Sequence, residues 1–410
     1  MPIFCPRAVA LAVALLPSFA SATPLSLDTA LQMAVQRSEA TRAARAGVLS
    51  TAEASQAAAQ LPDPTLRIGV DNLPVTGPDR LHTTRDSMTM KRIGISQEWL
   101  SADKRAARQA AADAAVSRET VQVQAAAAET RLQTALMYLD AFFAGEALKL
   151  ATLNARHAEE ELQALHARLS SAAGSSQDVL TRAGAQGITD DESADIQQQQ
   201  NAALVALQRW IGVSPEALLP PGPMTLPSEE AYVVGHPTVA SLQRDLDVAQ
   251  QLATVTAANR KPNWTWELAY SQRTGYSDMA SVGVSIPLPV APGARQDRDT
   301  AARLALVDKA EATLAEASRV AIAEYRTLRS DADRLQQRID RYRTGVINPA
   351  TQRTAAATAA YRSNQGNLTA VFESRHAEVE VQGKLLALQR NLAKTQMQLA
   401  LRPLTAEVAR

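Results

Sequence analysis

Residues 261–270 read KPNWTWELAY, and residues 61–70 read LPDPTLRIGV. In each stretch a proline near the start is followed by a run in which large apolar residues alternate with small or polar ones. In the later run the large residues are Trp264, Trp266, Leu268 and Tyr270. A period of two residues indicates a β-strand with one apolar face. We therefore predict strands at about 63–73 and 263–272.

A second strand is predicted shortly after each of these. The sequence IGIS at 93–96 corresponds to VGVS at 282–285, and both alternate apolar residues with Gly and Ser. These patterns place strands at about 87–100 and 279–289. In the earlier strand the apolar parity changes after Met88 and Met90, which predicts a β-bulge near Lys91 and Arg92.

The strand pairs belong to a larger internal repeat. The first pair of matching stretches is separated by 200 positions, the second pair by 189, and glycine-containing turns at 174 and 366 by 192. Three similar offsets in the same order predict a duplicated unit of about 190 residues. We expect repeats at 23–211 and 237–402, a Pro-rich linker at 212–236, and a tail at 403–410.

Long helices are predicted between the strands and the turns. Residues 101–170 contain no proline and a single glycine, Gly145. At 1.5 Å per residue such a helix is about 105 Å long. Residues 294–361 predict a second rod, with a kink near Gly345 and Pro349. After each turn the chain runs back as a second helix, so we expect helical hairpins at 101–210 and 294–400. The turn glycines should end the first helix of each hairpin in the left-handed conformation. A single opening helix is expected at 26–60.

The N-terminus has the pattern of a signal peptide. Arg7 precedes an apolar run at 8–16, and the small residues of Ala20-Ser21-Ala22 form a cleavage pattern. A signal peptide at 1–22 would take the mature chain out of the cytoplasm. Cys5, the single cysteine, lies within it, which leaves no disulfide, thiolate metal site, cysteine nucleophile or lipid-bearing cysteine in the mature chain.

Composition excludes further classes. The chain of 410 residues carries 42 Lys and Arg against 42 Asp and Glu, which argues against a nucleic-acid partner. Hydrophobic residues make up 46% and aromatic residues only 4%, so small side chains carry the apolar content and favour extended, closely packed helices. After the signal, no run of 18 apolar residues predicts a membrane helix. A membrane-crossing segment would therefore have to be built from strands.

Four strands cannot close a membrane sheet within one chain, because an open edge in lipid leaves backbone groups unpaired. Two copies would give eight strands with a nearly filled interior, whereas three copies would give twelve strands and a lumen. Trp264, Trp266 and Tyr270 suit a membrane interface. A soluble sandwich with a polar exterior is the alternative.

The ordered set of features resembles the TolC family of outer-membrane efflux factors. It comprises the signal peptide, the duplicated plan, the Pro62-Asp63-Pro64 start of the first strand, the Gly94-x-Ser96 and Gly283-x-Ser285 motifs and the glycine-centred turns. The first half is most similar to the heavy-metal CusC/CzcC-type branch.

The resemblance implies a mainly α protein with membrane β structure. Three copies would form a twelve-strand outer-membrane β-barrel continuous with a twelve-helix periplasmic α-barrel. The implied function is a passive conduit rather than an enzyme, without a cofactor. The implied partners are a periplasmic adaptor, an inner-membrane resistance-nodulation-division pump and outer-membrane lipid.

The resemblance also assigns the turns. The family's Gly and Asp-Val-Leu pattern falls on Gly174 and Asp178, while the second copy carries Ala370 at that acidic position and Glu373 later. Asp178 and Glu373 are therefore the candidate periplasmic gate, where threefold rings of like charge would bind cations. The alternative is that both face solvent on the helix exterior. Candidate adaptor-docking residues are Gly174, Ser175, Ser176, Gly366, Asn367 and Leu368.

Two other functions remain open. A periplasmic coiled-coil adaptor would also present a helical hairpin, but it should have one hairpin rather than two. An exit duct for type I protein secretion would share the whole fold. Enzyme motifs are missing from the sequence, and the five histidines lack metal-ligand spacing, so no metal site is expected. Those histidines are His82, His157, His166, His236 and His376.

Overall fold

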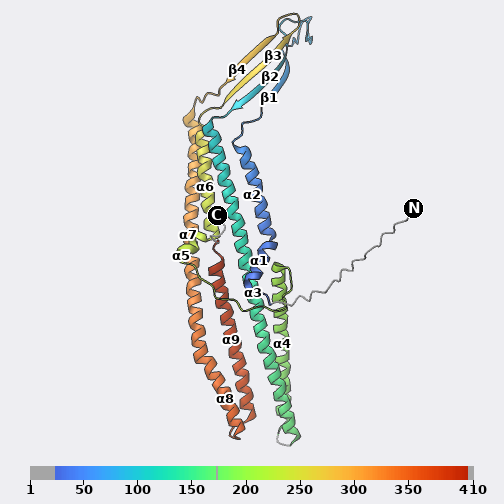
Figure 1. The fold of residues 1–410 in the computed structure, drawn as a ribbon, viewed down its shortest axis with the longest axis vertical. Helices are drawn as coiled ribbons and strands as arrows, with labels where there is room; N and C mark the ends of the chain where they lie inside the picture. Colours follow the sequence, from blue (N-terminus) through green and yellow to red (C-terminus); the bar gives the residue numbers. More distant parts are fainter. Residues whose placement is uncertain (1–23, 172–173, 405–410) are drawn as a thin grey trace, which may run out of the picture.

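A four-stranded sheet lies at one end of a long helical body in the computed structural model, which describes residues 24–171 and 174–404 (Figure 1). The expected signal peptide at 1–22 lies outside the described residues, as does most of the expected tail at 403–410. The two halves of the chain repeat the same order of helix, strand, strand and helical hairpin. The predicted duplication of the fold is therefore confirmed.

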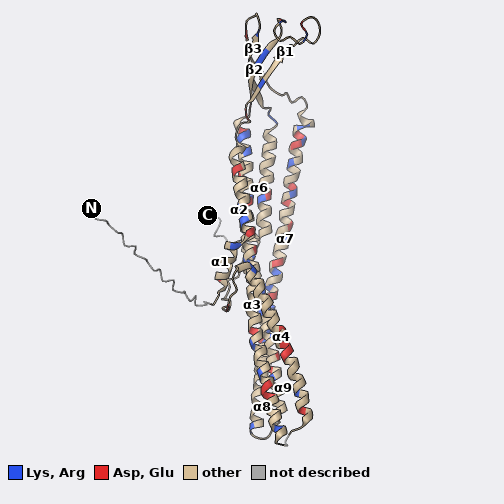
Figure 2. Ribbon diagram, turned by 90° about the vertical axis from the view of Figure 1, so that its right-hand side faces the viewer, with Lys and Arg blue, Asp and Glu red and all other residues tan. Residues whose placement is uncertain are grey.

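The helices lie side by side along the long axis of the body in two perpendicular views (Figure 1 and Figure 2). Between the sheet and the middle they are α2 (Glu39–Ala58), the first half of α3 (Ala102–Ser170), α6 (Pro237–Ala258) and α7 (Gln296–Tyr342), which continues past the middle. Beyond the middle they are the second half of α3, α4 (Ser176–Ile211), α8 (Asn348–Arg362) and α9 (Leu368–Leu401). The 69 residues of α3 extend about 100 Å and run through both parts.

Short elements lie near the middle of the body. They are α1 (Leu27–Arg37) and α5 (Glu229–Gly235). One more short element, the 3-10 turn η1 (Pro292–Ala294), lies close to the sheet. The expected single helix at 26–60 is divided at Ser38. The Ser38 hydroxyl accepts a hydrogen bond from the Thr41 amide at 3.2 Å, so this residue caps α2 where α1 ends.

The kink expected in the second rod is present as a π-helical turn. This turn, η2 (Arg343–Ile347), separates α7 from α8. Pro349 in the first turn of α8 lacks an amide hydrogen, and its ring crowds the carbonyl of the residue four positions earlier, Gly345. A wider π turn accommodates that crowding, so the irregularity has a local cause.

The sheet is antiparallel, with strand order β1-β2-β3-β4. The strands are β1 (Thr65–Asp71), β2 (Met90–Trp99), β3 (Trp264–Arg273) and β4 (Met279–Ser285). The β2–β3 pairing joins the two repeats, with Ile93 opposite Tyr270 and Trp99 opposite Trp264. Within the described chain, β1 and β4 are the edges of the sheet.

The predicted bulge near Lys91 and Arg92 is wrong. Pairing of β2 with both neighbours is continuous through these residues, and Met90 lies opposite Arg273 on the polar face of the sheet. The change in the apolar pattern between Met90 and Ile93 arises because Met90 lies on the polar face, not because the strand has an extra residue. A flexible thioether tolerates either face, so it is a weak marker of strand orientation.

The turn glycines also differ from expectation. Neither Gly174 nor Gly366 has a positive φ; in the second turn Asn364 has the left-handed conformation, with φ 59°. A Cβ on Gly366 would lie 3.0 Å from the Ala360 Cβ, and one on Gly174 would lie 3.0 Å from the Leu169 amide nitrogen. Close approach of the chain, rather than a left-handed stop, accounts for glycine at both turns.

The main core lies at the middle of the body, where α1, α3, α4 and α9 meet. Its fully buried members include Ala135, Tyr138, Leu139, Leu207 and Ile211. Small side chains let these helices approach closely, and many larger apolar side chains elsewhere stay exposed in the single chain. Among the described residues, no helix combines the length and apolarity needed to span a bilayer.

Candidate functional site

The sheet has one exposed apolar face. The register places Ile68, Ile93 and Tyr270 in one row across β1, β2 and β3. The next row on the same face contains Leu66, Ile95, Leu268 and Val282. These side chains are 39–80% exposed, with Ile68 at 76% and Val282 at 80%. An exposed apolar face of this extent on an isolated protomer indicates a surface that contacts a membrane or another protein.

The opposite face of the sheet is polar and charged. The Arg92 guanidinium lies 2.7 Å from the Glu267 carboxylate and 3.5 Å from that of Asp71. Arg273 on the same face donates to the Ser87 carbonyl at 2.7 Å. Apolar residues on one face and charged residues on the other are the pattern of a strand wall that separates lipid from water.

Aromatic side chains lie where the sheet meets the helices. Trp264 pairs with Trp99 at this end of the strands, Trp266 lies on the same face, and they are 58%, 50% and 41% exposed, respectively. Tyr270 lies farther along that face and donates a hydrogen bond to the Asp278 carboxylate. The sequence analysis missed Trp99, although its parity with Ile93 and Ile95 was a usable signal.

At the other end of the body, two hairpin turns carry the predicted gate and docking residues. Ser175 caps α4, and the Asn367 side chain caps α9 by accepting from the Ala370 amide at 2.8 Å. Asp178 in the first turn of α4 and Glu373 in the second turn of α9 are both exposed. Of the docking candidates Gly174, Ser175, Ser176, Gly366, Asn367 and Leu368, only Leu368 is buried.

The structure places Asp178 and Glu373 on different hairpins, without a recorded contact between them in the described chain. Their role as gate residues stays a prediction.

A buried ion pair connects the helices closer to the middle. Glu161 of α3 is 1% exposed and pairs with Arg182 of α4. The guanidinium of Arg182 also lies 5.7 Å from the ring centroid of Phe372 on α9. These contacts link the first hairpin to the second. Sequence analysis missed them because contact across two helices depends on their relative register.

A tyrosine fixes the linker against the middle of α3. The Tyr138 hydroxyl lies 2.7 Å from the carbonyl oxygens of both Leu25 and Leu219, which share its single proton. Burial raises the pKa of Tyr138 to about 12, so the hydroxyl keeps its proton at neutral pH. The start of the described chain and the linker are thereby held together beside α3.

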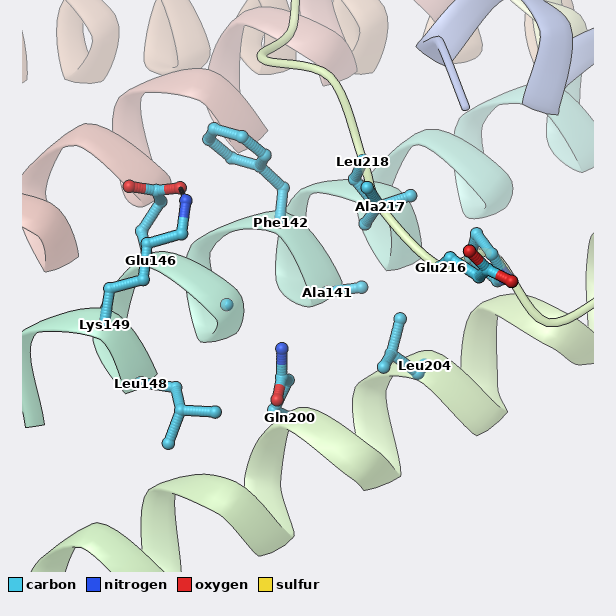
Figure 3. A pocket seen from close by; sticks show the side chains of 12 residues that line it. Ala141, Phe142, Glu146, Leu148, Lys149, Gln200, Leu204, Glu216, Ala217 and Leu218 are labelled. Carbon is cyan, nitrogen blue, oxygen red and sulfur yellow. Dashed lines mark hydrogen bonds and ion pairs between the residues drawn. The ribbon is translucent and has the colours of Figure 1, made fainter. Parts of the chain in front are cut away.

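The linker also closes a small pocket against α3 and α4, with a volume of ≈ 250 Å³ (Figure 3). Lys149 on its wall already pairs with Glu146 at 2.6 Å, and Gln200 reaches toward the space from α4 (Figure 3). The described part of the chain holds no cluster of three or more His, Cys, Asp or Glu side chains that could bind a metal ion.

A second buried cluster joins α5, α7 and the end of α9. His236 lies 3.3 Å from the Glu324 carboxylate, which also forms an ion pair with Arg402 at 2.9 Å. The Leu404 amide donates to the Gly235 carbonyl at 2.7 Å. Burial lowers the pKa of His236 and outweighs the opposing effect of Glu324. His236 therefore serves in packing the midsection rather than in an exposed binding site.

Several solved structures with this architecture are outer-membrane proteins or channels. The outer membrane protein VceC of Vibrio cholerae superposes with a TM-score of 0.72 at 18% identity, covering 92% of this chain and 96% of VceC. CusC superposes with a TM-score of 0.71 at 14% identity, covering 92% of this chain and 91% of CusC. The chain has the fold of the TolC-like outer-membrane channels. The predicted fold class and the TolC resemblance are confirmed.

Sequence comparison adds a relative from the heavy-metal branch of these TolC-like proteins. The cobalt-zinc-cadmium resistance protein CzcC of Cupriavidus metallidurans is 29% identical over 283 residues. The match spans 66% of this chain and 64% of CzcC, which is less than two thirds of that relative's length. No family model matches the sequence. The solved structures that this TolC-like chain resembles include an outer-membrane protein and a transmembrane channel.

Proposed function

We propose that the chain is the outer-membrane channel subunit of a tripartite efflux system, which exports heavy-metal cations or drugs. The observation that carries this proposal is the two-faced sheet, apolar and exposed on one side and charged on the other, on a TolC-like fold. The likeness to CzcC favours metal ions as the exported class. The subunit acts as a passive duct that reaches from the outer membrane into the periplasm.

Three copies complete the wall. In one chain, β1 and β4 each have a single neighbouring strand, so each leaves an edge that lipid could not satisfy. The two edge strands have the same length of 7 residues, which allows β4 of one copy to pair with β1 of the next. Twelve strands then surround a lumen lined by Arg92 and Glu267, and the helices continue the wall into the periplasm.

The hairpin ends form the opening that a periplasmic adaptor controls, below an inner-membrane pump. Rings of Asp178 and Glu373 narrow this end and attract cations, because each residue recurs three times around the axis. The exposed turn residues Gly174, Ser175 and Asn367 provide the docking surface. The Arg182–Glu161 pair holds the first hairpin together just behind that end.

Deleting the gene and measuring growth on Cu, Zn, Co, Ni, Cd and Ag salts and on hydrophobic drugs tests this function. We expect increased sensitivity to at least one metal or drug, restored by the wild-type gene. Complementation with a variant carrying Arg92→Ala and Glu267→Ala is the matched comparison, since it removes one ion pair from the polar face of the sheet without changing its net charge. Loss of protein secretion with unchanged metal and drug tolerance would instead identify a secretion duct.

A further inference from the structure

A basic pocket lies at the junction between the sheet and the helices. It has a volume of ≈ 420 Å³ and lies between the start of α3, the α6–β3 connection and the segment that leads from β4 into α7. Five cationic side chains line it and no acidic side chain does. They are Lys104, Arg108, Arg260, Lys261 and Arg295. Such a concentration of one sign of charge indicates an anionic ligand.

The positive charge is only partly neutralised within the described chain. Arg260 pairs with Asp297 at 2.8 Å, and Lys261 lies 3.4 Å from Asp103. The other three cations have no carboxylate at ion-pair distance among the described residues. The pocket therefore has a surplus of positive charge.

Lys104 is the most enclosed of the three. It is 4% exposed, and its ammonium group donates to the neutral Asn263 side chain at 2.5 Å. Burial, and then the nearby charge of Arg108, lower the pKa of Lys104 and outweigh the opposing effect of the Glu98 carboxylate, which accepts from Asn263 at 2.7 Å. A bound anion would offset both effects, because it would supply the negative charge that the pocket lacks.

The position of the pocket indicates which anion it meets. The exposed Trp99–Trp264 pair lies at this end of the strands, and interfacial tryptophans mark the level of lipid headgroups. Pro287 and Leu288 form part of the pocket wall, and Leu288 is 78% exposed. Leu288 continues the alternation of Val284 and Ile286, so the cations adjoin an apolar surface. A phosphate attached to acyl chains fits both features.

We propose that this pocket binds the phosphate headgroup of an anionic phospholipid from the periplasmic leaflet of the membrane around the sheet. The proposal rests on the proposed outer-membrane function. The headgroup phosphate contacts Arg108 and Arg295, while the acyl chains extend along the apolar side of the strands. The bound lipid thereby stabilises the junction between the sheet and the helices.

Native mass spectrometry of the intact, delipidated oligomer tests the proposal, with phosphatidylglycerol and phosphatidylcholine as titrated lipids. The wild type is compared with Arg108→Gln/Arg295→Gln. Each basic side chain near a lipid surface contributes about a fivefold factor, so we expect about 25-fold weaker phosphatidylglycerol binding. The control Arg334→Gln/Arg338→Gln removes the same charge from an exposed part of α7 and should bind like the wild type.

The outcomes separate this inference from the proposed function. Selective phosphatidylglycerol binding that only the pocket variant loses supports the lipid site. Equal loss in both variants, or no preference over phosphatidylcholine, overturns it. Thermal stabilisation by inorganic phosphate equal to that by phosphatidylglycerol would assign the pocket to a soluble anion and also overturn it. Protein that sediments with the outer membrane but shows no lipid preference leaves the channel function standing, whereas its absence from that membrane contradicts the channel itself.

Discussion

Replacing Arg182 with Met should loosen the hairpin behind the periplasmic end of the channel. Glu161 is 1% exposed, and Arg182 is the cation paired with it. Removing one partner of a buried pair leaves an uncompensated charge and typically destabilises by 3–5 kcal/mol. Since the Arg182 side chain is 25% exposed, water reaches part of the site, and we take the lower value of about 3 kcal/mol.

Hydrogen–deuterium exchange with mass spectrometry measures this effect locally. A destabilisation of about 3 kcal/mol raises the exchange rate of amides that open with the hairpin by about 100-fold. The control Arg156→Met breaks the exposed pair with Glu160, at 3.3 Å, and should change exchange by less than about fivefold. The double variant Glu161→Gln/Arg182→Met should recover most of the protection. Exchange in Arg182→Met within threefold of the wild type would refute the reasoning.

Three further predictions concern the gate, the linker and the midsection. Asp178→Asn with Glu373→Gln should raise single-channel conductance in a planar bilayer and weaken block by divalent cations; unchanged conductance and block would place both carboxylates away from the constriction. Tyr138→Phe should lower stability by about 1 kcal/mol, because the Leu219 carbonyl loses the Tyr138 donor while the Leu25 carbonyl keeps the Leu219 amide, and calorimetry with an unchanged Tm would contradict this. Burial lowers the pKa of His236 in the folded protein, so on acidification this histidine is protonated in the unfolded chain before it is protonated in the folded one. The free energy of unfolding should therefore fall as the pH drops below about 6.5. A pH series of Tm values checks this; His236→Gln should flatten that slope, and an equal slope in the variant would assign it to other groups.

The sequence was most informative where a pattern repeats over many residues. Alternation in β3 and the lack of proline in 101–170 predicted a strand and a rod, and both are present. The prediction failed where one residue decided the outcome. Met90 suggested a bulge that is not there, because methionine packs on either face, and Gly366 is required by a close approach to Ala360 rather than by its own φ.

Features that depend on the meeting of distant segments were beyond sequence reasoning. Glu161 and Arg182 pair only because α3 and α4 have a particular register, and each would ordinarily be expected on a solvated face. The basic pocket likewise combines Lys104, Arg260 and Arg295 from three separate segments. Trp99, by contrast, could have been found from the parity of its own strand.

Disulfide trapping between the edge strands tests most directly whether neighbouring copies close the wall. Strands β1 and β4 lie three strand spacings apart in one protomer, about 14 Å, which is too far for a disulfide within the chain. Cys5 is the single native cysteine. Cysteines at Leu66, Ile68 or Val70 combined with Val282 or Val284 can therefore bridge only different copies.

We predict that at least one such pair, oxidised in intact outer membranes, gives a covalent trimer on a non-reducing gel, while each single-cysteine variant does not. Monomers alone for every pair, in protein recovered from the outer membrane, would contradict the closed three-chain wall.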